Sequence, residues 1–556
     1  MVDANLNAWW CRLFWRQLIA AGVERILYCP GNRNLPLGCA AEACDELQLS
    51  VQQEERSAAF IALGHCLASG RPTAVCTTSG SAVANCLPAL AEAVAVGAPL
   101  LLISADRPAC LQNCEAPQTM PQLGCSVDFR VAGASLPEPA AEAGAELLAQ
   151  LTELVEKLAV GPVHVNVPLD DPLPPLPLPG FIQPADPPPV ASRPARAPAT
   201  SDWPAWARPG LRGLIVAGPR CPIDVTVVDA LARATGFPVL ADAASELRRP
   251  AVAHLVCLGD ALASGRLGRH QADCLIRLGP APIARPMWEY CQRHRGPVLR
   301  IADAPVPADF CHAHFDCAVS PDAVWLERLG DLLADGDDRW RQDWLTAEDR
   351  GLAARADWLA EADWGEVQAA ALIADHAGDY DLLHLANSMA VRHGNLHLLA
   401  DERPLAVFAN RGVNGIDGTV ATFLGELLAR PRQHGLLLLG DLAFLHDLPA
   451  LAAAAQQVVS GTITVINNNG GGIFDLLPGR DLPEAIDLLR APAPIDIGHS
   501  AAQFGLGHRA CFDAESLAEA LAWSRNQRGV QVVEVQVPAE SLRDEQPDLV
   551  QRIATG

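Results

Sequence analysis

Short apolar runs alternate with amphipathic, helix-length stretches along most of the chain. In residues 1–180, for example, the apolar runs at 73–77 and 99–104 are separated by a stretch with the spacing of a helix. The same alternation returns in residues 211–345 and 376–556. Apolar runs that alternate with helices are typical of parallel sheets covered by helices on both faces. The pattern therefore predicts an α/β protein with three doubly wound parallel-sheet domains.

Two segments depart from this alternation. Residues 181–210 are rich in proline, which favours a semi-rigid extended linker without chemistry of its own. Residues 346–375 are charged, contain tryptophan and have helical periodicity, so we expect a helical connector there. The predicted order is an N-terminal domain at 1–180, the linker, a central domain at 211–345, the connector and a C-terminal domain at 376–556.

The charge of the chain narrows the range of partners. Its formal net charge is −24, which argues against nucleic acids and anionic membranes. Lys157 is the only lysine, and it lies on the polar side of an amphipathic pattern. A P-loop needs a lysine after its glycines, and a Schiff-base enzyme needs a buried lysine. Both of these classes are therefore disfavoured.

The cysteines and the N-terminal segment indicate the compartment. The chain has 17 cysteines but no CxxC pair, and most of them stand singly in apolar surroundings. Buried, reduced thiols fit this pattern better than disulfides or a zinc site. The N-terminus lacks the pattern of a signal peptide, and no apolar run reaches the ~18 residues of a membrane span. We expect a cytoplasmic protein.

Polar residues follow two apolar runs of the C-terminal domain, where strands should end. The run 436–439 ends in Gly440-Asp441, and the run 462–466 ends in three asparagines and three glycines. The carboxyl ends of parallel strands meet at one edge of a sheet, where ligands bind. Asp, Asn and backbone carbonyl oxygens suit Mg²⁺, and glycine-rich backbone offers N–H groups to anions. This stretch predicts a site for magnesium and a diphosphate.

Three other features gain meaning beside this stretch. Glu55 stands at the start of a helix, where acidic residues are ordinary partners of the helix dipole. Ile416 lies in a loop between Gly415 and Gly418, and Asn387 precedes a helix that it could cap. Taken alone, each of them is typical of an ordinary turn or cap.

Arginines stand on loops that follow predicted strands. Each of them alone is more often part of a surface ion pair. Substrates bind at strand-end loops, however, and planar guanidinium groups suit carboxylates. Several arginines on such loops indicate a substrate with more than one carboxylate. The arginines concerned are Arg33, Arg107, Arg285, Arg392 and Arg411.

The motifs together resemble a known family. The order Gly440-Asp441, a helix-length gap, Asn468 and Gly470 resembles the cofactor motif of thiamine-diphosphate (ThDP) enzymes. Over the whole chain the sequence is similar to the SEPHCHC synthase (MenD) family of menaquinone biosynthesis, where SEPHCHC is 2-succinyl-5-enolpyruvyl-6-hydroxy-3-cyclohexene-1-carboxylate. The segments that carry this resemblance are, in order, PGNRNLPL, EERSAAFIALG, TTSGSAVAN, SADRP, NSMAVR, NRGVNGIDG, GDLAFLHDL and NNNGGGIF.

The resemblance implies a fold and a reaction. The three domains would be the pyrimidine-binding, central and diphosphate-binding domains of ThDP enzymes. 2-Oxoglutarate would lose CO₂, and the succinyl carbanion would add in 1,4 fashion to isochorismate. The cofactors would be ThDP and Mg²⁺, with Mn²⁺ as an alternative ion. The family holds the two ends of ThDP in different subunits, which implies a homodimer or a tetramer of two dimers.

The resemblance also assigns roles to residues. Glu55 would bind N1′ of the aminopyrimidine and promote removal of the C2 proton. Asp441, Asn468 and the carbonyl of Gly470 would bind the metal. The residues with catalytic roles would be Glu55, Arg33, Arg392 and Arg411. Further cofactor contacts would come from Asn387, Ser388, Ile416, Gly440, Leu442, Ile473 and Phe474. The substrate contacts would be Asn32, Arg33, Arg107, Gln118, Arg285, Ser388, Arg392, Arg411, Ile473, Phe474 and Leu477.

Some positions depart from the family pattern, and two alternatives stay open. Asn32 and Asn34 replace serines, and Pro286 stands where a second basic residue is common, which bears on isochorismate binding. One alternative is another ThDP-dependent 2-oxoacid decarboxylase or carboligase. The other is a non-catalytic relative, but the retention of Glu55 and Asp441 argues against it.

Overall fold

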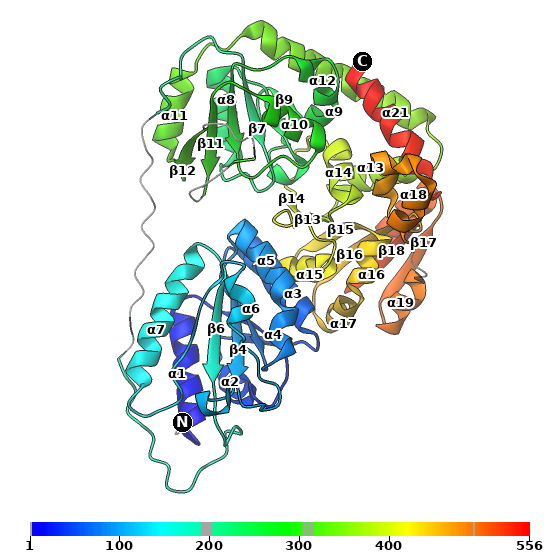
Figure 1. Cartoon of the computed structure of the whole chain (residues 1–556). Helices are drawn as coiled ribbons and strands as arrows, with labels where there is room; N and C mark the ends of the chain where they lie inside the picture. Colours follow the sequence, from blue (N-terminus) through cyan, green and yellow to red (C-terminus); the bar gives the residue numbers. More distant parts are fainter. Residues whose placement is uncertain are drawn as a thin grey trace. The chain divides into compact units, whose positions relative to one another are not determined.

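The computed structural model describes residues 3–188, 190, 203–303, 309–310, 315–492 and 495–555, apart from the side chains of residues 481, 483, 485 and 487. Within these residues the chain forms three parallel sheets of six strands each, flanked by helices (Figure 1). This confirms the predicted α/β class with three parallel sheets. Residues 189 and 191–202 of the predicted linker lie outside the described residues.

The first sheet is formed by the N-terminal part of the chain. Its strands are β1 (Arg25–Tyr28), β2 (Gln48–Val51), β3 (Thr73–Thr77), β4 (Leu100–Asp106), β5 (Ala132–Ser135) and β6 (Val163–Pro168). The spatial order is β2-β1-β3-β4-β6-β5. Strands β3, β4 and β6 are buried along their whole length, whereas β2 and β5 are partly exposed. Burial of the inner strands on both faces explains why they are nearly continuous apolar runs.

Helices cover this sheet and complete its core. They are α1 (Leu6–Ala20), α2 (Leu35–Glu42), α3 (Glu55–Ser69), α4 (Ser81–Asn85), α5 (Leu87–Val96), α6 (Gly124–Val127) and α7 (Gly144–Glu156). Helix α1 contributes three fully buried tryptophans, Trp9, Trp10 and Trp15. The indole N–H of Trp15 donates to the carbonyl of Leu37, which ties α1 to α2. This packing fixes the loop between β1 and α2, where Arg33 lies.

The second sheet belongs to the central domain. Its strands are β7 (Gly213–Ala217), β8 (Val239–Ala241), β9 (Leu255–Val256), β10 (Cys274–Leu278), β11 (Val298–Ala302) and β12 (Phe315–Val319), in the order β12-β11-β10-β7-β8-β9. The sheet grows from β7 through β8 to β9 on one side, and then from β10 through β11 to β12 on the other side. The point where the strand order reverses lies between β7 and β10, as in dinucleotide-binding folds. The flanking helices are α8 (Val225–Thr235), α9 (Gly259–Ser264), α10 (Arg285–Arg293) and α11 (Ala323–Leu332).

The third sheet carries the stretch with the predicted metal site. Its strands are β13 (Leu382–Leu385), β14 (Ala406–Phe408), β15 (His434–Gly440), β16 (Ser460–Asn467), β17 (Gly507–Cys511) and β18 (Val530–Gln536), in the order β14-β13-β15-β16-β18-β17. Numbered from its own first strand, this is the same order as in the first sheet. The two outer sheets therefore share one topology, although no internal repeat is visible in the sequence.

The C-terminal part of the chain supplies the remaining helices, and α16 among them follows the strand end at Gly440. They are α13 (Glu366–Ala377), α14 (Met389–His397), α15 (Thr419–Ala429), α16 (Asp441–His446), α17 (Leu448–Gln456), α18 (Pro483–Arg490), α19 (Ile497–Gln503), α20 (Ala514–Arg525) and α21 (Ser541–Thr555). The long helix α12 (Asp338–Glu361) precedes them. No described helix combines the length and the apolar character that crossing a membrane requires.

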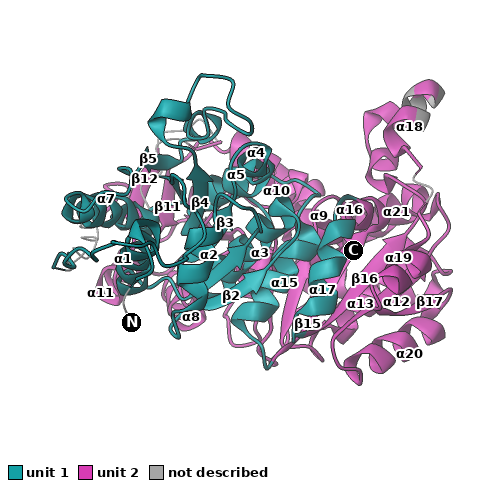
Figure 2. Cartoon of the chain, turned by 90° about the horizontal axis from the view of Figure 1, so that it is seen from below, with its two compact units in different colours: residues 1–196, 410–432, 446–459 teal, residues 197–409, 433–445, 460–556 magenta. Residues whose placement is uncertain are grey.

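The contacts divide the chain into two compact units (Figure 2). Unit 1 consists of Met1–Arg196, Asn410–Arg432 and His446–Val459, and unit 2 consists of Ala197–Ala409, Gln433–Leu445 and Ser460–Gly556. Unit 1 thus holds the first sheet together with α15 and α17, and unit 2 holds the second and third sheets. The predicted domain boundaries stay predictions.

Helices α3 and α15 touch backbone to backbone inside unit 1. A Cβ atom on Gly64 of α3 would overlap the carbonyl oxygen of Thr422. Likewise, a Cβ atom on Gly425 of α15 would overlap the carbonyl oxygen of Ile61. Two glycines without side chains therefore allow this crossing. The crossing holds the loop before α15, which contains Arg411 and Ile416, in unit 1.

Candidate active site

The predicted metal ligands lie at the ends of two neighbouring strands in unit 2. Strands β15 and β16 pair in parallel, with Gly440 opposite Ile466. Asp441 follows β15 as the first residue of α16, and Asn468 follows β16 directly. The N–H of Gly470 donates to Oδ2 of Asp441 at 2.8 Å. The structure therefore brings the start of α16, with Asp441, against the turn that contains the other two predicted ligands, Asn468 and Gly470.

The environment of Asp441 is buried but rich in donors. The side chain is 3% exposed, and Oδ1 accepts the N–H of Leu442 at 2.7 Å. Burial raises the pKa of Asp441 to about 6, and the hydrogen bonds from Gly470 and Leu442 oppose that rise. The carboxylate is held by backbone N–H groups. Gly440, the last residue of β15, places it at the strand end.

The glycine turn after Asn468 needs its glycines. Asn469 and Gly470 both have positive φ, at 60° and 127°. A Cβ atom on Gly470 would also overlap the carbonyl oxygen of Arg490. Only glycine satisfies both the backbone angle and the close approach. The N–H of Gly470 is thereby kept beside Asp441.

The three predicted ligands suit a hard divalent cation. One carboxylate, one amide oxygen and one backbone carbonyl are all oxygen ligands, which suits Mg²⁺ or Mn²⁺ completed by diphosphate oxygens. Among the described residues there is no group of three or more His, Cys, Asp or Glu side chains that could hold a metal.

A carboxylate that the sequence analysis missed touches the predicted metal ligand Asn468. Its Nδ2 donates to Oε2 of Glu366 at 2.7 Å, and Nε2 of His393 hydrogen-bonds to Oε1 of Glu366 at 2.9 Å. All three side chains are buried. Glu366 is an acidic residue in the first turn of α13, which is too common a feature to single out in a sequence.

Ser388 and Arg392 lie at the start of α14, after the end of β13. Ser388 has φ 67° and ψ −124°, a conformation that is strained for any residue but glycine. Such strain is concentrated at functional sites. The guanidinium of Arg392 is half-buried and donates to the carbonyl of Ser388, while Asn387 is buried beside them. Burial lowers the pKa of Arg392, and the charge of Asp260 opposes that effect.

Apolar residues follow the glycine turn. Ile473 and Phe474 are half-buried in a 3₁₀ turn at Gly472–Leu476, and Ile473 packs against the core of unit 2. Leu477 is 38% exposed. Leu442, on α16, is half-buried. These positions give apolar surface within a few residues of the predicted metal ligands.

Glu55 is not the cap of its helix. It is the first residue of α3, but the side chain of Glu54 accepts the N–H groups of Arg56 and Ser57 and so caps the helix. The carboxylate of Glu55 is half-buried and accepts Nδ2 of Asn85 at 3.2 Å. The common role for an acidic residue at this position is therefore filled by its neighbour.

The loop that contains Arg411 and Ile416 is anchored to unit 1. Both carboxylate oxygens of Glu92 accept backbone N–H groups of this loop, from Gly412 at 2.6 Å and from Val413 at 2.7 Å. Arg411 and Ile416 are both half-buried. The loop is thus fixed at its start by a buried carboxylate, and its apolar residue stays partly accessible.

Three of the predicted substrate residues in unit 1 lie together. Nη1 of Arg107 donates to Oγ of Ser79 at 2.8 Å and to the carbonyl of Gln118 at 3.0 Å. Burial and then the positive charge of Arg33 lower the pKa of Arg107. Arg33 donates to the carbonyl of Leu169 at 2.9 Å.

The two asparagines that depart from the family pattern differ in role. Asn34 is fully buried, donates to the carbonyl of Cys29 at 2.8 Å and accepts from the hydroxyl of Tyr28. It therefore supports the loop. Asn32 is exposed and is the one of the pair that faces solvent.

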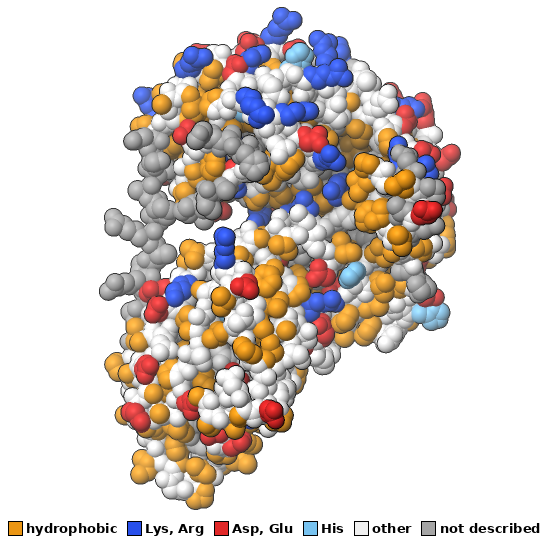
Figure 3. Space-filling model, viewed as in Figure 1, with side chains coloured by type: hydrophobic (Ala, Val, Ile, Leu, Met, Phe, Trp, Pro, Cys, Tyr) orange, Lys and Arg blue, Asp and Glu red, His pale blue; other side chains and the backbone are white. Residues whose placement is uncertain are grey.

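Arg285 stands apart from these residues in what it contacts. It is the first residue of α10 in unit 2, its side chain is 74% exposed, and it pairs with Glu289 at 2.6 Å. With Arg269 and Arg293 it lines an open depression of about 600 Å³. On the face shown in Figure 3, basic side chains gather over the central domain. Arg285 has the environment of a surface ion pair.

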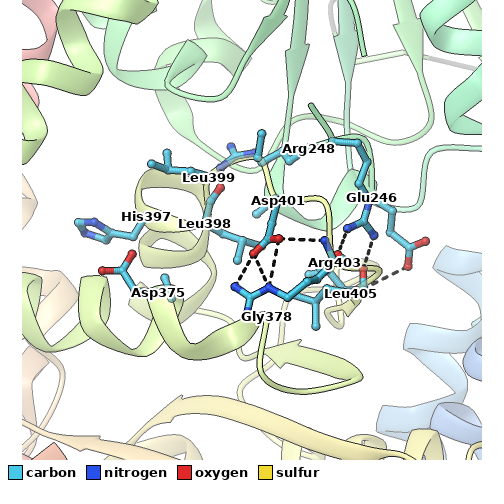
Figure 4. Close-up of a pocket in the computed structure, with 15 residues that line it drawn as sticks. Glu246, Arg248, Asp375, Gly378, His397, Leu398, Leu399, Asp401, Arg403 and Leu405 are labelled. Atoms are coloured by element: carbon cyan, nitrogen blue, oxygen red, sulfur yellow. Dashed lines mark hydrogen bonds and ion pairs between the residues drawn. The ribbon is translucent and has the colours of Figure 1, made fainter. Parts of the chain in front are cut away.

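Unit 2 also contains a cavity that no predicted site residue lines. Its volume is about 260 Å³, and charged residues that line it form ion pairs and hydrogen bonds with one another (Figure 4). Arg403 forms an ion pair with Asp401 at 2.6 Å, and Arg248 donates to the carbonyls of Ala241 and Cys257. The lining holds three arginines and three carboxylates, so neither charge is in excess.

Comparison with known proteins gives concordant results. The family model described as "Thiamine pyrophosphate enzyme, N-terminal TPP binding domain" matches residues 11–125, and the corresponding "C-terminal TPP binding domain" matches residues 393–535. Curated proteins named 2-succinyl-5-enolpyruvyl-6-hydroxy-3-cyclohexene-1-carboxylate synthase are similar over nearly the whole chain. The protein of Halorubrum lacusprofundi is 33% identical over 97% of this chain and 96% of its own length.

Two bacterial proteins of the same name give similar values. That of Roseiflexus castenholzii is 32% identical over 99% of this chain and 98% of its own length. That of Geobacillus thermodenitrificans is 32% identical over 96% of this chain and 94% of its own length. The likeness covers all three sheets and the connecting segments.

Proposed function

Since this chain belongs to the SEPHCHC synthase family of thiamine-pyrophosphate enzymes, we propose that it makes SEPHCHC from 2-oxoglutarate and isochorismate. The first substrate would be decarboxylated, and its succinyl carbanion would add in 1,4 fashion to the second. The observation that carries the proposal is the hydrogen bond that joins Asp441, after β15, to Gly470 in the turn with Asn468, after the adjacent strand β16.

The metal end would lie in that turn. Oxygens of Asp441, Asn468 and Gly470 would hold Mg²⁺ or Mn²⁺, which would supply positive charge for binding the diphosphate. When bound, ThDP supplies a carbon nucleophile and a cationic thiazolium ring that accepts the electron pair released by decarboxylation. Gly440, Leu442, Asn387, Ser388, Ile416, Ile473 and Phe474 would complete the contacts to the cofactor.

Glu55 would act at the other end of the cofactor. Its carboxyl group would bind N1′ of the aminopyrimidine and hold the proton there, as a general acid–base group does. The capping role of Glu54 supports this assignment, because Glu55 is left to one side-chain donor, Asn85. A homodimer is the proposed active unit, with 1–180, 211–345 and 376–556 as its domains.

Arginines would bind the carboxylates of the two substrates. Arg392 and Arg411 would hold the distal carboxylate of 2-oxoglutarate, because a guanidinium binds a carboxylate through two parallel hydrogen bonds. Arg33, Arg107 and Gln118 would face isochorismate, and the contacts of Arg107 support this group. Asn32, Arg285, Ser388, Ile473, Phe474 and Leu477 would complete the substrate contacts.

One assay tests the proposal against its nearest rival. The purified protein is supplied with ThDP, Mg²⁺ and 2-oxoglutarate, with and without isochorismate, and CO₂ and isochorismate are followed. The proposal predicts that isochorismate is consumed in step with CO₂ release. Release of CO₂ with isochorismate untouched would identify another ThDP-dependent 2-oxoacid decarboxylase or carboligase instead.

A further inference from the structure

The side-chain amide of Asn468 has two ends, and only one of them can bind a cation. The oxygen Oδ1 is a ligand for Mg²⁺, whereas the NH₂ group is a donor that a cation repels. The two ends have nearly the same size and shape, so packing alone does not choose between them. A hydrogen-bond partner must fix which end faces the metal.

Glu366 is that partner. Its Oε2 lies 2.7 Å from Nδ2 of Asn468, and both side chains are buried. An ionised carboxylate only accepts hydrogen bonds, so it can face the NH₂ end of Asn468 but not the oxygen end. Among the described residues, no hydrogen bond reaches Oδ1 of Asn468. The oxygen end therefore points away from Glu366 and keeps its acceptor capacity.

Two further contacts hold Glu366 in place. Its second oxygen, Oε1, lies 2.9 Å from Nε2 of His393, which is 1% exposed. Its backbone N–H donates to Oγ of Ser541 at 3.1 Å. Gly472 lies against the NH₂ end of Asn468, since a Cβ atom on it would overlap Nδ2. The carboxylate, the imidazole and the glycine backbone together surround one end of the amide.

We propose that Glu366 is a positioning residue for the metal site, which turns Oδ1 of Asn468 toward Mg²⁺, and that His393 holds Glu366 for this task. The inference rests on the proposed function, because Asn468 is a metal ligand only if that proposal holds. Glu366 itself does not touch the ion in this assignment. Outer-shell partners of this kind change metal affinity by about 10–100-fold when they are removed.

The decisive variant is Glu366→Gln. Glutamine has the same length, but its NH₂ group can donate to Oδ1 of Asn468 and so turn the amide round. We expect the Mn²⁺ affinity of the ThDP-loaded protein, measured by electron paramagnetic resonance, to fall about 10–100-fold. Turnover at saturating metal should recover toward that of the unmodified protein, because the fault lies in metal binding.

Glu545→Gln is a matched control. Glu545 lies on α21, its Oε2 accepts the N–H of Val367 near the start of α13 at 3.3 Å, and its charge acts on the same region as that of Glu366. The substitution removes one negative charge from the region around Glu366, but Glu545 forms no hydrogen bond with Asn468 among the described residues. We expect its Mn²⁺ affinity to stay close to that of the unmodified protein. Circular dichroism and the thermal midpoint check that both variants fold.

The outcomes separate the inference from the proposed function. If Glu366→Gln binds Mn²⁺ as tightly as the unmodified protein, or if Glu545→Gln weakens binding equally, the orientation role is wrong. If the unmodified protein shows no ThDP-dependent Mn²⁺ binding, the proposed function itself fails. Loss of affinity in Glu366→Gln alone supports the inference.

Discussion

The proposed metal-binding residues and the proposed substrate arginines are held in different ways. Asp441 and Asn468 are buried, and backbone N–H groups or a buried carboxylate fix their side chains. Arg33, Arg107 and Arg392 are half-buried and donate mainly to backbone carbonyls, while Arg285 is largely exposed. A metal requires ligands fixed in advance, whereas a carboxylate substrate can be met by side chains that keep some freedom.

The difference has a consequence for function. Substitution of a residue that binds the cofactor should stop the reaction of both substrates, because both react at the same cofactor. Changes at an arginine should affect one substrate and leave cofactor binding intact.

The largest effect should come from Glu55→Gln. Glutamine can hydrogen-bond N1′ but cannot hold the proton there as a carboxylate does, so turnover should fall by about 10²–10⁴-fold. The variant should still bind ThDP, which can be measured by tryptophan fluorescence. Glu54→Gln is the control, since Glu54 caps α3. It should cost about 0.5–2 kcal/mol of stability and leave turnover of the folded enzyme intact. Normal turnover of Glu55→Gln would remove Glu55 from the mechanism.

Asp441→Asn should come next. The substitution removes the charge of the carboxylate that Gly470 and Leu442 hold at the strand end. We expect metal affinity to fall by at least the ~10–100-fold that an outer-shell partner costs, and ThDP affinity to fall with it. Isothermal titration with ThDP, with and without Mg²⁺, measures both. An unchanged dependence of ThDP affinity on Mg²⁺ would show that the metal binds elsewhere.

Arg107→Lys should have an intermediate and selective effect. Lysine lacks the planar guanidinium group that donates to both Ser79 and Gln118, so the loop loses a contact. The substrate carboxylate also loses a bidentate hydrogen-bond donor. The KM for isochorismate should rise roughly tenfold, as expected for about 1.4 kcal/mol from one charge-assisted hydrogen bond. CO₂ release from 2-oxoglutarate should be unchanged. Arg285→Ala, at an exposed ion pair, should change the same KM much less. The reverse ranking would contradict the contrast between these arginines.

The smallest effect concerns pH and 2-oxoglutarate. Burial, and then the negative charge of Asp242, raise the pKa of Asp260 to about 7, while Arg248 and Arg392 oppose this rise. Above that pH the ionised Asp260 competes with substrate for Arg392, so the KM for 2-oxoglutarate should rise modestly. In Asp260→Asn the KM should stay level between pH 6 and 8. A rise that persists in the variant would assign it to another group.

The sequence predicted the parts of the site that depend on short segments. Asp441 and Asn468 follow two adjacent strands, so alternation of apolar runs and a strand-end rule were sufficient to bring them together. Glu366 was missed because it is 102 positions from Asn468 and looks like any acidic residue at a helix start. The crossing at Gly64 and Gly425 was missed for the same reason, since a glycine within a helix carries no mark of its distant partner.

The sequence predicted the fold class, but it did not predict the strand order of the sheets or the contacts between distant helices. Three parallel sheets follow from the alternation of apolar runs and helices. The shared strand order of the first and third sheets does not, because strand order depends on contacts between segments that share no sequence pattern. The assignment of α15 to unit 1 depends likewise on its contact with α3.

The central claim is that this chain joins 2-oxoglutarate, without its C1 carboxylate, to isochorismate. The direct measurement supplies uniformly ¹³C-labelled 2-oxoglutarate with unlabelled isochorismate, ThDP and Mg²⁺, and determines the product mass. The account predicts one product that carries all the labelled carbons except the one lost as CO₂, together with the intact enolpyruvyl group. Labelled succinic semialdehyde beside unchanged isochorismate would contradict it.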